Sequence, residues 1–329
     1  MLRKLPKIEL HCHLDGSVRL NTIIEVAKQE NIELPSFEVE TLDSLIKVPE
    51  DCTSLEEYLK RFDLPNKIMQ SKSSLKRIAF ELLEDCAREN VKYIEVRFAP
   101  SLHRQKGLSL EEIIESVLEG MHEAEKIYDI KSNLIIGCMR SMSVEEAFSV
   151  VNAGEKYLNR GVVAVDLCGI ELEGFASIYK EPIDLARSLG YRVTIHAGEG
   201  ASGKNVLDAI NLLGAERIGH GIRTKDTNEA YDLAKAKKIV FEMCPTSNVQ
   251  TKAINNFSKH PFYNFYKDDM LVTISTDNRT VSDIDLTNEL NIIFDEFNMG
   301  IEEYSKIYLN AVDACFADSN TKDWLRSLI

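Results

Sequence analysis

Short apolar runs rich in valine and isoleucine recur along the chain and alternate with longer segments of helical periodicity. Runs that are apolar at nearly every position are typical of strands in a parallel sheet covered by helices on both faces. We predict eight such strands, at residues 8–14, 92–99, 133–139, 162–168, 192–196, 217–220, 239–244 and 271–276. This number favours an α/β fold of the (β/α)₈ TIM-barrel type. An open doubly wound sheet is less suitable, because the glycine-rich first turn of such sheets is absent after Leu14.

An unusually long connection, about residues 17–90, follows the first predicted strand. Its periodicity predicts helical segments at residues 20–31, 42–46, 54–62 and 74–89. A connection of this length exceeds one crossover helix, so we expect a helical insertion that folds over one end of the barrel. No linker-like stretch divides the chain, and we expect residues 1–329 to form a single domain.

One helix of the insertion has an apolar face, which we call the lid face. Its side chains recur at i, i+3, i+4 and i+7, and they are Leu55, Tyr58, Leu59 and Phe62. Ser54 and Glu57 resemble a capping box at the start of this helix. Most such faces pack in a core. Because this insertion directly follows a strand with a His-x-His pattern, we favour a second interpretation, an apolar lid over a substrate.

Composition and charge limit the possible partners. Lys and Arg total 39 and Asp and Glu total 53, which gives a net charge of −14 without a basic stripe, so we expect neither nucleic acid nor a membrane as a partner. The seven cysteines form no C-x-x-C pair, which indicates reduced thiols. There is also no apolar signal region or membrane-spanning run. We therefore predict a cytoplasmic protein, and the sequence leaves the oligomeric state open.

Polar residues gather at the carboxyl ends of the predicted strands, where the chemistry of such barrels lies. On the first strand, His11 and His13 are two residues apart, so we expect them and Asp15 to face the same way. The fifth strand ends in His196, and Asp277 follows the eighth. Buried imidazole and carboxylate groups need partners, and a shared metal ion supplies one. The predicted metal ligands are His11, His13, His196 and Asp277.

Three imidazole nitrogens and the Asp277 oxygen would leave one coordination position open for water. This donor set suits Zn²⁺, with Fe²⁺ or Co²⁺ as alternatives. Zinc lowers the pKa of bound water to about 7, so hydroxide exists at neutral pH. We expect Glu199, just beyond the fifth strand, to donate a proton to a substrate nitrogen. His220, flanked by two glycines, is expected to orient the attacking water.

The segments with these residues resemble those of the adenosine deaminase family of metal-dependent, amidohydrolase-type barrels. The resemblance covers nearly the whole chain and rests on the joint order and spacing of residues 11–17 (His-Cys-His-Leu-Asp-Gly-Ser), 54–63, 166–169, 196–199, 217–221, 242–248 and 275–277. It implies the hydrolytic deamination of adenosine and 2′-deoxyadenosine to inosine and 2′-deoxyinosine, with release of ammonia, in purine salvage. It also implies the same four metal ligands.

The resemblance assigns catalytic roles to two residues. Glu199 matches the acid that protonates purine N1, and His220 matches the residue beside the attacking hydroxide. The Asp277 carboxylate can take the proton as water attacks. Protonation of N1 withdraws electron density from C6, where the hydroxide adds and from which ammonia leaves. Positioned proton transfer of this kind contributes about 10²–10⁴-fold to a rate.

The resemblance also implies contacts to the nucleoside. Asp15 matches a carboxylate that meets the ribose 5′-hydroxyl, Gly169 matches a backbone donor to purine N3, and the lid face matches the cover of the nucleoside. Many members have a second aspartate after the metal ligand, where this chain has Asn278. Its amide NH₂ can still donate to purine N7. The expected substrate contacts are therefore His13, Asp15, Gly169, Asn278 and the lid face.

Other functions share this fold. Adenine deaminases and 6-aminodeoxyfutalosine deaminases have the same chemistry with a different substrate. AMP deaminases need a phosphate site, and Asp15 would repel a 5′-phosphate. A non-catalytic nucleoside-binding barrel is the alternative from a different class. The remaining histidines have no role in this scheme: we expect His103 near the pocket rim, and His122 and His260 at helix and surface positions.

Overall fold

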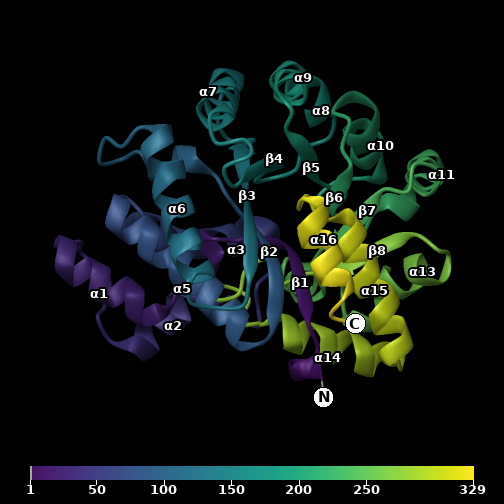
Figure 1. Ribbon diagram of the computed structural model, residues 1–329, viewed down its shortest axis with the longest axis horizontal. Helices are drawn as coiled ribbons and strands as arrows, with labels where there is room; N and C mark the ends of the chain where they lie inside the picture. The colour runs from purple at the N-terminus through teal and green to yellow at the C-terminus, as the bar shows by residue number, and fades with distance from the viewer. Residues whose placement is uncertain (1) are drawn as a thin grey trace.

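The computed structural model describes residues 2–329, which form a barrel of eight parallel strands in sequence order (Figure 1). The strands are β1 (Lys7–His13), β2 (Val91–Phe98), β3 (Lys131–Met139), β4 (Val162–Cys168), β5 (Arg192–Ala197), β6 (Arg217–His220), β7 (Val240–Met243) and β8 (Leu271–Ile274). All eight predicted strands are present, with ends that differ by at most two residues from the expected ones. The predicted (β/α)₈ barrel is confirmed.

Backbone hydrogen bonds just beyond β8 join the last strand to the first. The Asp277 N–H donates to the His11 carbonyl at 2.8 Å, and the His13 N–H donates to the Asp277 carbonyl at 2.7 Å. The buried Glu9 carboxylate accepts hydrogen bonds from the backbone N–H and the hydroxyl of Thr276, at 3.0 and 2.8 Å. The His-x-His strand is thus attached to the loop that carries Asp277.

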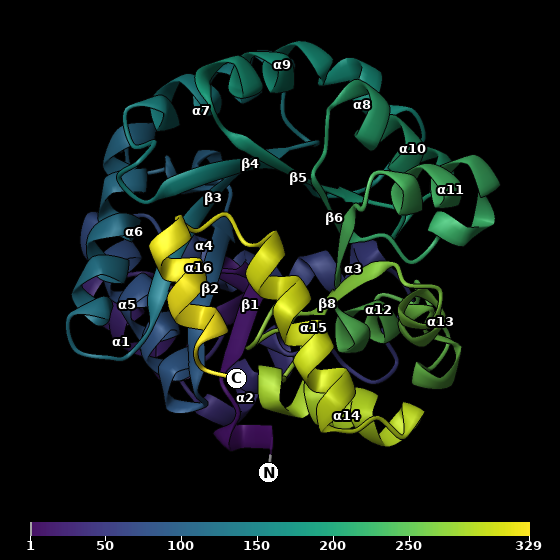
Figure 2. The same ribbon diagram turned by 45° about the vertical axis from the view of Figure 1, so that its right-hand side comes forward.

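A ring of helices covers the outside of the sheet (Figure 2). The helices of this ring are α5 (Lys72–Arg88), α6 (Leu110–Glu125), α7 (Val144–Glu155), α9 (Lys180–Leu189), α10 (Gly203–Leu212), α11 (Asn228–Ala236), α13 (Phe262–Lys267) and α15 (Ile301–Ala314). Helix α15 packs against β8 and β1 and so covers the junction between the last and first strands. Four further helices are α8 (Phe175–Ile178), α12 (Pro245–Gln250), α14 (Leu286–Phe297) and α16 (Ser319–Arg326).

Local sequence signals determine where these helices begin. Helix α6 starts with a capping box, in which Ser109 Oγ accepts from the Glu112 N–H at 3.1 Å and the Glu112 carboxylate accepts from the Ser109 N–H at 3.0 Å. Its buried side chains then follow at helical spacing, with Ile113, Val117 and Met121 on one face. That face packs along α5 and against β3. No helix among residues 2–329 is both long and apolar enough to cross a membrane.

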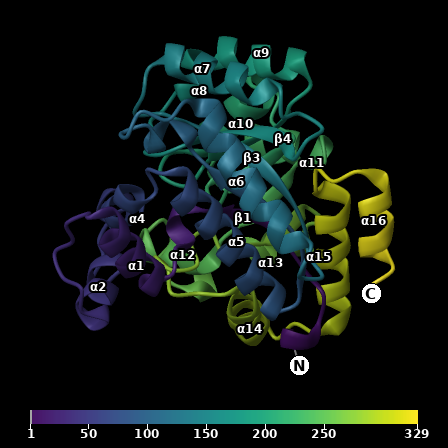
Figure 3. The ribbon, with the colours of Figure 1, turned by 60° about the vertical axis from the view of Figure 1, so that its left-hand side comes forward.

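The connection after β1 contains the extra helices α1 (Leu20–Glu30), α2 (Val39–Ile46), α3 (Leu55–Leu59) and α4 (Asp63–Ile68). Figure 3 shows α1, α2 and α4 on the side of the molecule opposite to α15 and α16. The last predicted segment of the insertion is α5, which packs along α6 and against β2. It therefore serves as the crossover helix, and the extra helices end at residue 68.

The start of α3 differs in one detail from the expected capping box. Ser54 Oγ accepts a hydrogen bond from the Glu57 N–H at 3.2 Å, as expected for an N-cap. The Glu57 carboxylate, however, accepts from the Thr53 N–H at 2.8 Å and not from that of Ser54. The helix ends at Leu59, and a 3₁₀ turn at Lys60–Phe62 continues the apolar face.

Charged side chains occupy the inside of the barrel, and we call this set the interior charge network. Its fully buried members are Glu95, Arg97, Asp166, Arg217 and Glu242, from β2, β4, β6 and β7. Arg97 donates to Asp166 at 2.7 Å and to Glu242 at 2.6 Å. Arg217 donates to Glu242 at 2.6 Å and to Glu95 at 2.5 Å. The Arg217–Glu242 pair joins the neighbouring strands β6 and β7. The other contacts join strands that are not neighbours and so cross the barrel interior, and acids alternate with arginines.

Replacement of Arg217 tests the cohesion of this network. Arg217→Met would leave the buried Glu95 carboxylate without a cation and Glu242 with Arg97 alone, which lowers the free energy of unfolding by about 3–5 kcal/mol. The matched control is Arg192→Met, because both guanidinium groups lie over the Phe316 ring but Arg192 forms its ion pair with the exposed Glu216. The control should lose at most about 1 kcal/mol. Urea unfolding measures the free energy of unfolding of both variants, and an equal loss in the two would contradict this interpretation.

Candidate active site

A cavity of about 200 Å³ opens at the carboxyl ends of the strands, several times the roughly 30 Å³ share of one water molecule. The lid face lines one part of it. The other predicted residues that line it are His13, Asp15, Gly169, His196, Glu199, His220, Asp277 and Asn278. Of the predicted site residues, only the fully buried His11 is not part of the cavity wall.

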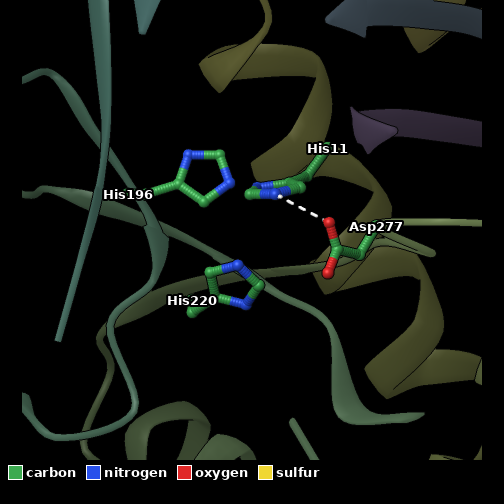
Figure 4. A group of neighbouring side chains, drawn as sticks. All are labelled: His11, His196, His220 and Asp277. Atoms are coloured by element: carbon green, nitrogen blue, oxygen red, sulfur yellow. Dashed lines mark ion pairs between the residues drawn. The ribbon is translucent and has the colours of Figure 1, made fainter. Parts of the chain in front are cut away.

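Three histidines and one aspartate meet beside this cavity (Figure 4). His11, His196, His220 and Asp277 each offer one ligand atom, and these atoms all lie within 4.8 Å of one another. The predicted ligand His13 is not a member of this set. Its Nε2 nevertheless lies 3.2 Å from His196 Nε2 and 3.4 Å from Asp277 Oδ1. The strand ends therefore bring five candidate ligands together, one more than the sequence predicts.

The spacing of these atoms fits a shared cation. Two ligands about 2.0–2.2 Å from one ion at a near-tetrahedral angle are about 3.3–3.6 Å apart. The His11 and His13 Nε2 atoms are each 3.4 Å from Asp277 Oδ1. Within residues 2–329, the buried His11 Nε2 makes no hydrogen bond. A polar atom of this kind is costly unless a ligand satisfies it, so the site can hold a metal ion.

The interior charge network orients two of the rings. His11 Nδ1 lies 2.8 Å from Glu242 Oε2, and His196 Nδ1 lies 2.8 Å from Asp166 Oδ2. Carboxylates on Nδ1 leave Nε2 as the atom available to a metal. Burial lowers the pKa of His11 to about 4, so its ring is neutral. Burial opposes ionisation of Glu242, but Arg97 and Arg217 hold its pKa well below the usual range.

A second group of potential ligands lies next to the first. Asp166, Cys168 and His196 also have ligand atoms within 4.8 Å of one another. Burial, however, raises the pKa of the Cys168 thiol well above its usual value, and only the thiolate is a good ligand. Asp166 is already engaged by Arg97 and His196. This group therefore supports His196 and is a poor metal site in itself.

Backbone strain and a close approach mark the same region. His220 and Asp277 both have φ of +61°, in the left-handed region that residues other than glycine seldom adopt. Gly219 precedes His220, and a Cβ at this position would lie 2.8 Å from His11 Cε1. Only glycine lets β6 approach the His11 ring this closely.

The buried Glu171 side chain holds the loop that carries Glu199. Its carboxylate accepts hydrogen bonds from four consecutive backbone N–H groups, those of residues 198–201, at 2.7 to 3.2 Å. Glu199 Oε1 in turn accepts from Thr251 Oγ1 at 3.2 Å and Asn248 Nδ2 at 3.4 Å. Glu199 Oε2 lies 3.6 Å from His220 Nε2. The position of this carboxyl is therefore fixed from both its backbone and its side chain.

Asn278 contacts the insertion directly. Its Nδ2 donates to Tyr58 Oη at 2.8 Å, and Tyr58 Oη lies 2.8 Å from Ser282 Oγ. Tyr58 is the fully buried member of the lid face. These hydrogen bonds join α3 to the loop after β8. They pass through Asn278, the residue that stands where many members of the family have a second aspartate.

Several sequence predictions need correction. Strand β1 ends at His13, and Asp15 begins a 3₁₀ turn (Asp15–Ser17), so strand alternation does not orient it although it lines the cavity. His103 is fully buried against the Phe98 ring and is not among the described residues that line the cavity. His260 is 2% exposed and not a surface residue. His122 is exposed on α6, as expected.

Five residues behind the cavity wall have no predicted role in the site. They are Arg97, Asp166, Glu171, Glu242 and Asn248. A signal was present for three of them, because an ionisable residue inside an otherwise apolar strand must have a buried partner. Glu171 and Asn248 follow strands β4 and β7 and have no such signal.

Comparison with known proteins agrees with this geometry. The family model described as adenosine deaminase matches residues 6–329. The chain belongs to the adenosine deaminase family. A relative named adenosine deaminase, from Clostridium botulinum (strain Okra / Type B1), is 58% identical over 327 residues, covering 99% of this chain and 98% of the relative.

Two solved structures are similar to nearly all of this chain. Arabidopsis ADAL in complex with IMP has a TM-score of 0.89 at 28% identity, covering 99% of this chain and 96% of the other. A cog1816 amidohydrolase from Burkholderia ambifaria, solved with bound Zn, has a TM-score of 0.89 at 25% identity, covering 99% and 90%.

The close approach at Gly219 gives a test of the metal site. Gly219→Ala would push the new Cβ against His11 and displace its ring, so we expect zinc affinity to fall at least about tenfold, with the fold retained. The control is Gly200→Ala, where the nearest atom to the new Cβ is 3.5 Å away. Zinc titration with a competing chelator measures both variants. Unchanged affinity in Gly219→Ala would remove His11 from the site.

Proposed function

We propose that the protein catalyses the hydrolytic deamination of adenosine and 2′-deoxyadenosine to inosine and 2′-deoxyinosine, with release of ammonia. The observation that supports this most is the convergence of a candidate metal site and the buried Glu199 on one cavity that is also lined by the lid face. Relatives named adenosine deaminase, at 58% identity over nearly the full chain, support the same conclusion.

The proposed cofactor is one Zn²⁺ per chain, with Fe²⁺ or Co²⁺ as alternatives, held by His11, His13, His196 and Asp277. Three nitrogens and one oxygen are a donor set that suits zinc and leaves room for water. Bound zinc supplies Lewis acidity that lowers the pKa of water to about 7. The bound Zn of the related amidohydrolase supports this choice.

Glu199 is the proposed general acid. Its Oε1 accepts two hydrogen bonds from side-chain donors, so a proton carried by this carboxyl is on Oε2. From Oε2 the proton passes to purine N1, which makes C6 electron-poor and open to attack by water. After addition, the amino group takes up the proton that Asp277 accepts from the attacking water and leaves C6 as ammonia.

Asp277 is the proposed acceptor of the proton from the attacking water. Its Oδ1 faces His11 and His13, and its Oδ2 accepts a hydrogen bond from Ser247 Oγ at 2.6 Å. Burial opposes ionisation, but the neighbouring histidines hold the pKa of Asp277 well below its usual value. The carboxylate is therefore ionised when the substrate arrives.

Asp15 is the proposed contact for the ribose. Within the described chain its Oδ1 is buried and makes no hydrogen bond, so a substrate hydroxyl would satisfy it. Burial raises the pKa of Asp15 to about 6. This value is still below neutral pH, so most of the carboxyl is ionised. We propose that the 5′-hydroxyl donates to this oxygen.

The purine would lie between the lid face and the strand ends. Gly169 lines the cavity with φ of +94° and is the proposed backbone donor to N3. Asn278 is the proposed partner of N7. One N–H of its amide donates to Tyr58 Oη at 2.8 Å, and the second N–H would donate to the ring.

Nucleotides are the less suitable substrates. No Lys or Arg is present among the described residues that line the cavity, and the Asp15 carboxylate would repel a 5′-phosphate. The Arabidopsis relative was solved with the nucleotide IMP, but it is only 28% identical to this chain. Adenine has no ribose and would leave Asp15 unsatisfied.

We also propose a cytoplasmic location, which the seven free, buried cysteines support.

A substrate panel tests the proposed function. We expect adenosine and 2′-deoxyadenosine to have kcat/KM values at least about 10²-fold above those of adenine, AMP and 6-aminodeoxyfutalosine, because only the nucleosides satisfy Asp15 without extra charge or bulk. Ultraviolet absorbance of the purine measures each rate. Preference for adenine or 6-aminodeoxyfutalosine would select that alternative. Absence of turnover in zinc-loaded protein would indicate a non-catalytic nucleoside-binding barrel.

Glu199→Gln tests the proposed proton donor. The amide keeps the shape but has no acidic proton, so kcat should fall by about 10²–10⁴-fold while zinc content is unchanged. Glu173→Gln is the control, because this exposed acid accepts from the Ser202 N–H at 2.8 Å and does not line the cavity formed by the described residues. Near-normal kcat in Glu199→Gln would exclude Glu199 as the general acid.

A further inference from the structure

Three buried side chains outside the proposed chemistry form a continuous path to His220. His260 Nε2 lies 3.2 Å from Asn248 Oδ1, and Asn248 Nδ2 lies 3.0 Å from His220 Nδ1. Asn248 belongs to α12, and His260 precedes α13. All three side chains are at most 2% exposed, so solvent does not supply alternative partners.

The path begins at a group that can only donate. The backbone N–H of Phe262 donates to His260 Nδ1 at 3.2 Å. That nitrogen must therefore be unprotonated, and the proton of the neutral ring is on Nε2. Burial lowers the pKa of His260 to about 3, which agrees with a neutral ring.

The orientation of the next group follows. Because His260 Nε2 carries a proton, it donates to Asn248, and the atom that faces it must be the amide oxygen. The amide nitrogen then faces His220 Nδ1. An amide nitrogen can only donate, so His220 Nδ1 is an acceptor and the proton of this ring is on Nε2.

We propose that His260 and Asn248 are positioning residues that hold His220 as the Nε2–H tautomer, which makes His220 a hydrogen-bond donor at the site and prevents it from acting as a metal ligand. Both of its nitrogens are then used: Nδ1 accepts from Asn248, and Nε2 points its proton toward Glu199 Oε2, 3.6 Å away. This inference deepens the proposed function, on which the roles of His220 and Glu199 rest.

The assignment decides between the five candidate ligands. His220 is within ligand distance of His11, His196 and Asp277, but a nitrogen that carries a proton has no lone pair for a metal. His13 Nε2, at 3.2 Å from His196 Nε2 and 3.4 Å from Asp277 Oδ1, is then the third imidazole. The second N–H of Asn248 also reaches Glu199 Oε1 at 3.4 Å, so one amide orients both His220 and Glu199.

The tautomer is measured directly by nuclear magnetic resonance of the metal-free protein with ¹⁵N-labelled histidine. Long-range proton–nitrogen correlations distinguish Nδ1–H from Nε2–H, and the spectrum of His220→Gln identifies the signals of His220. We expect His220 and His260 both to carry the proton on Nε2. A His220 ring with its proton on Nδ1 would overturn the proposal.

Asn248→Asp is the informative variant. Its carboxylate still accepts from His260, but it places an acceptor against His220 Nδ1, so the proton of His220 should move to Nδ1. His260→Gln keeps a donor at the position of Nε2 and should leave His220 unchanged. Thr251→Val removes a hydrogen bond to Glu199 Oε1 without touching the path and is the matched control. An unchanged His220 in Asn248→Asp would contradict the proposal.

Zinc affinity provides a second measurement that needs no turnover. His13→Ala should weaken zinc binding at least about tenfold, and His220→Ala should leave it within about twofold of the wild type. The reverse order would show that His220 is a ligand. Because neither the spectra nor the titration uses a substrate, failure of the substrate panel would leave this inference intact, and the converse also holds.

Discussion

The close contacts of Glu242 and Asp166 with the Nδ1 atoms of His11 and His196, at 2.8 Å each, are the interactions on which the rest of the site depends. An imidazole can bind a metal through either nitrogen, and a carboxylate on Nδ1 leaves Nε2 available to the metal. The two acids are themselves fixed by Arg97, which donates to both at 2.6 to 2.7 Å. One guanidinium group thus sets the separation of two candidate metal ligands.

This arrangement explains why charged residues occupy positions inside the barrel where valine or isoleucine is usual. A buried ion pair seldom stabilises a fold more than apolar packing of equal volume, because desolvation offsets the attraction. The benefit here is that the buried ion pairs fix the positions of the candidate metal ligands. Glu171 acts in the same way on the loop of Glu199, where it accepts from four backbone N–H groups. Buried acids therefore aim both the candidate ligands and the proposed proton donor.

Sequence pattern predicted the parts of this structure that repeat. The eight strands follow from apolar runs, and the residues at their carboxyl ends meet because parallel strands share one edge. Pairings across the barrel, such as Arg97 with Glu242, could not be predicted, because they depend on which strands lie opposite each other. His260 is buried where it meets Asn248 and the Phe262 N–H, contacts without sequence periodicity. The Tyr58–Asn278 hydrogen bond similarly needs the fold of the insertion.

In the proposed site, imidazole nitrogens and one carboxylate oxygen, and no thiolate, converge on a single cation. X-ray absorption spectroscopy of the purified, zinc-loaded protein identifies the atoms bound to the metal. We expect one zinc per chain, with nitrogen and oxygen neighbours at about 2.0–2.2 Å and no sulfur neighbour. Absence of bound zinc, or a sulfur neighbour at about 2.3 Å from Cys168, would contradict it.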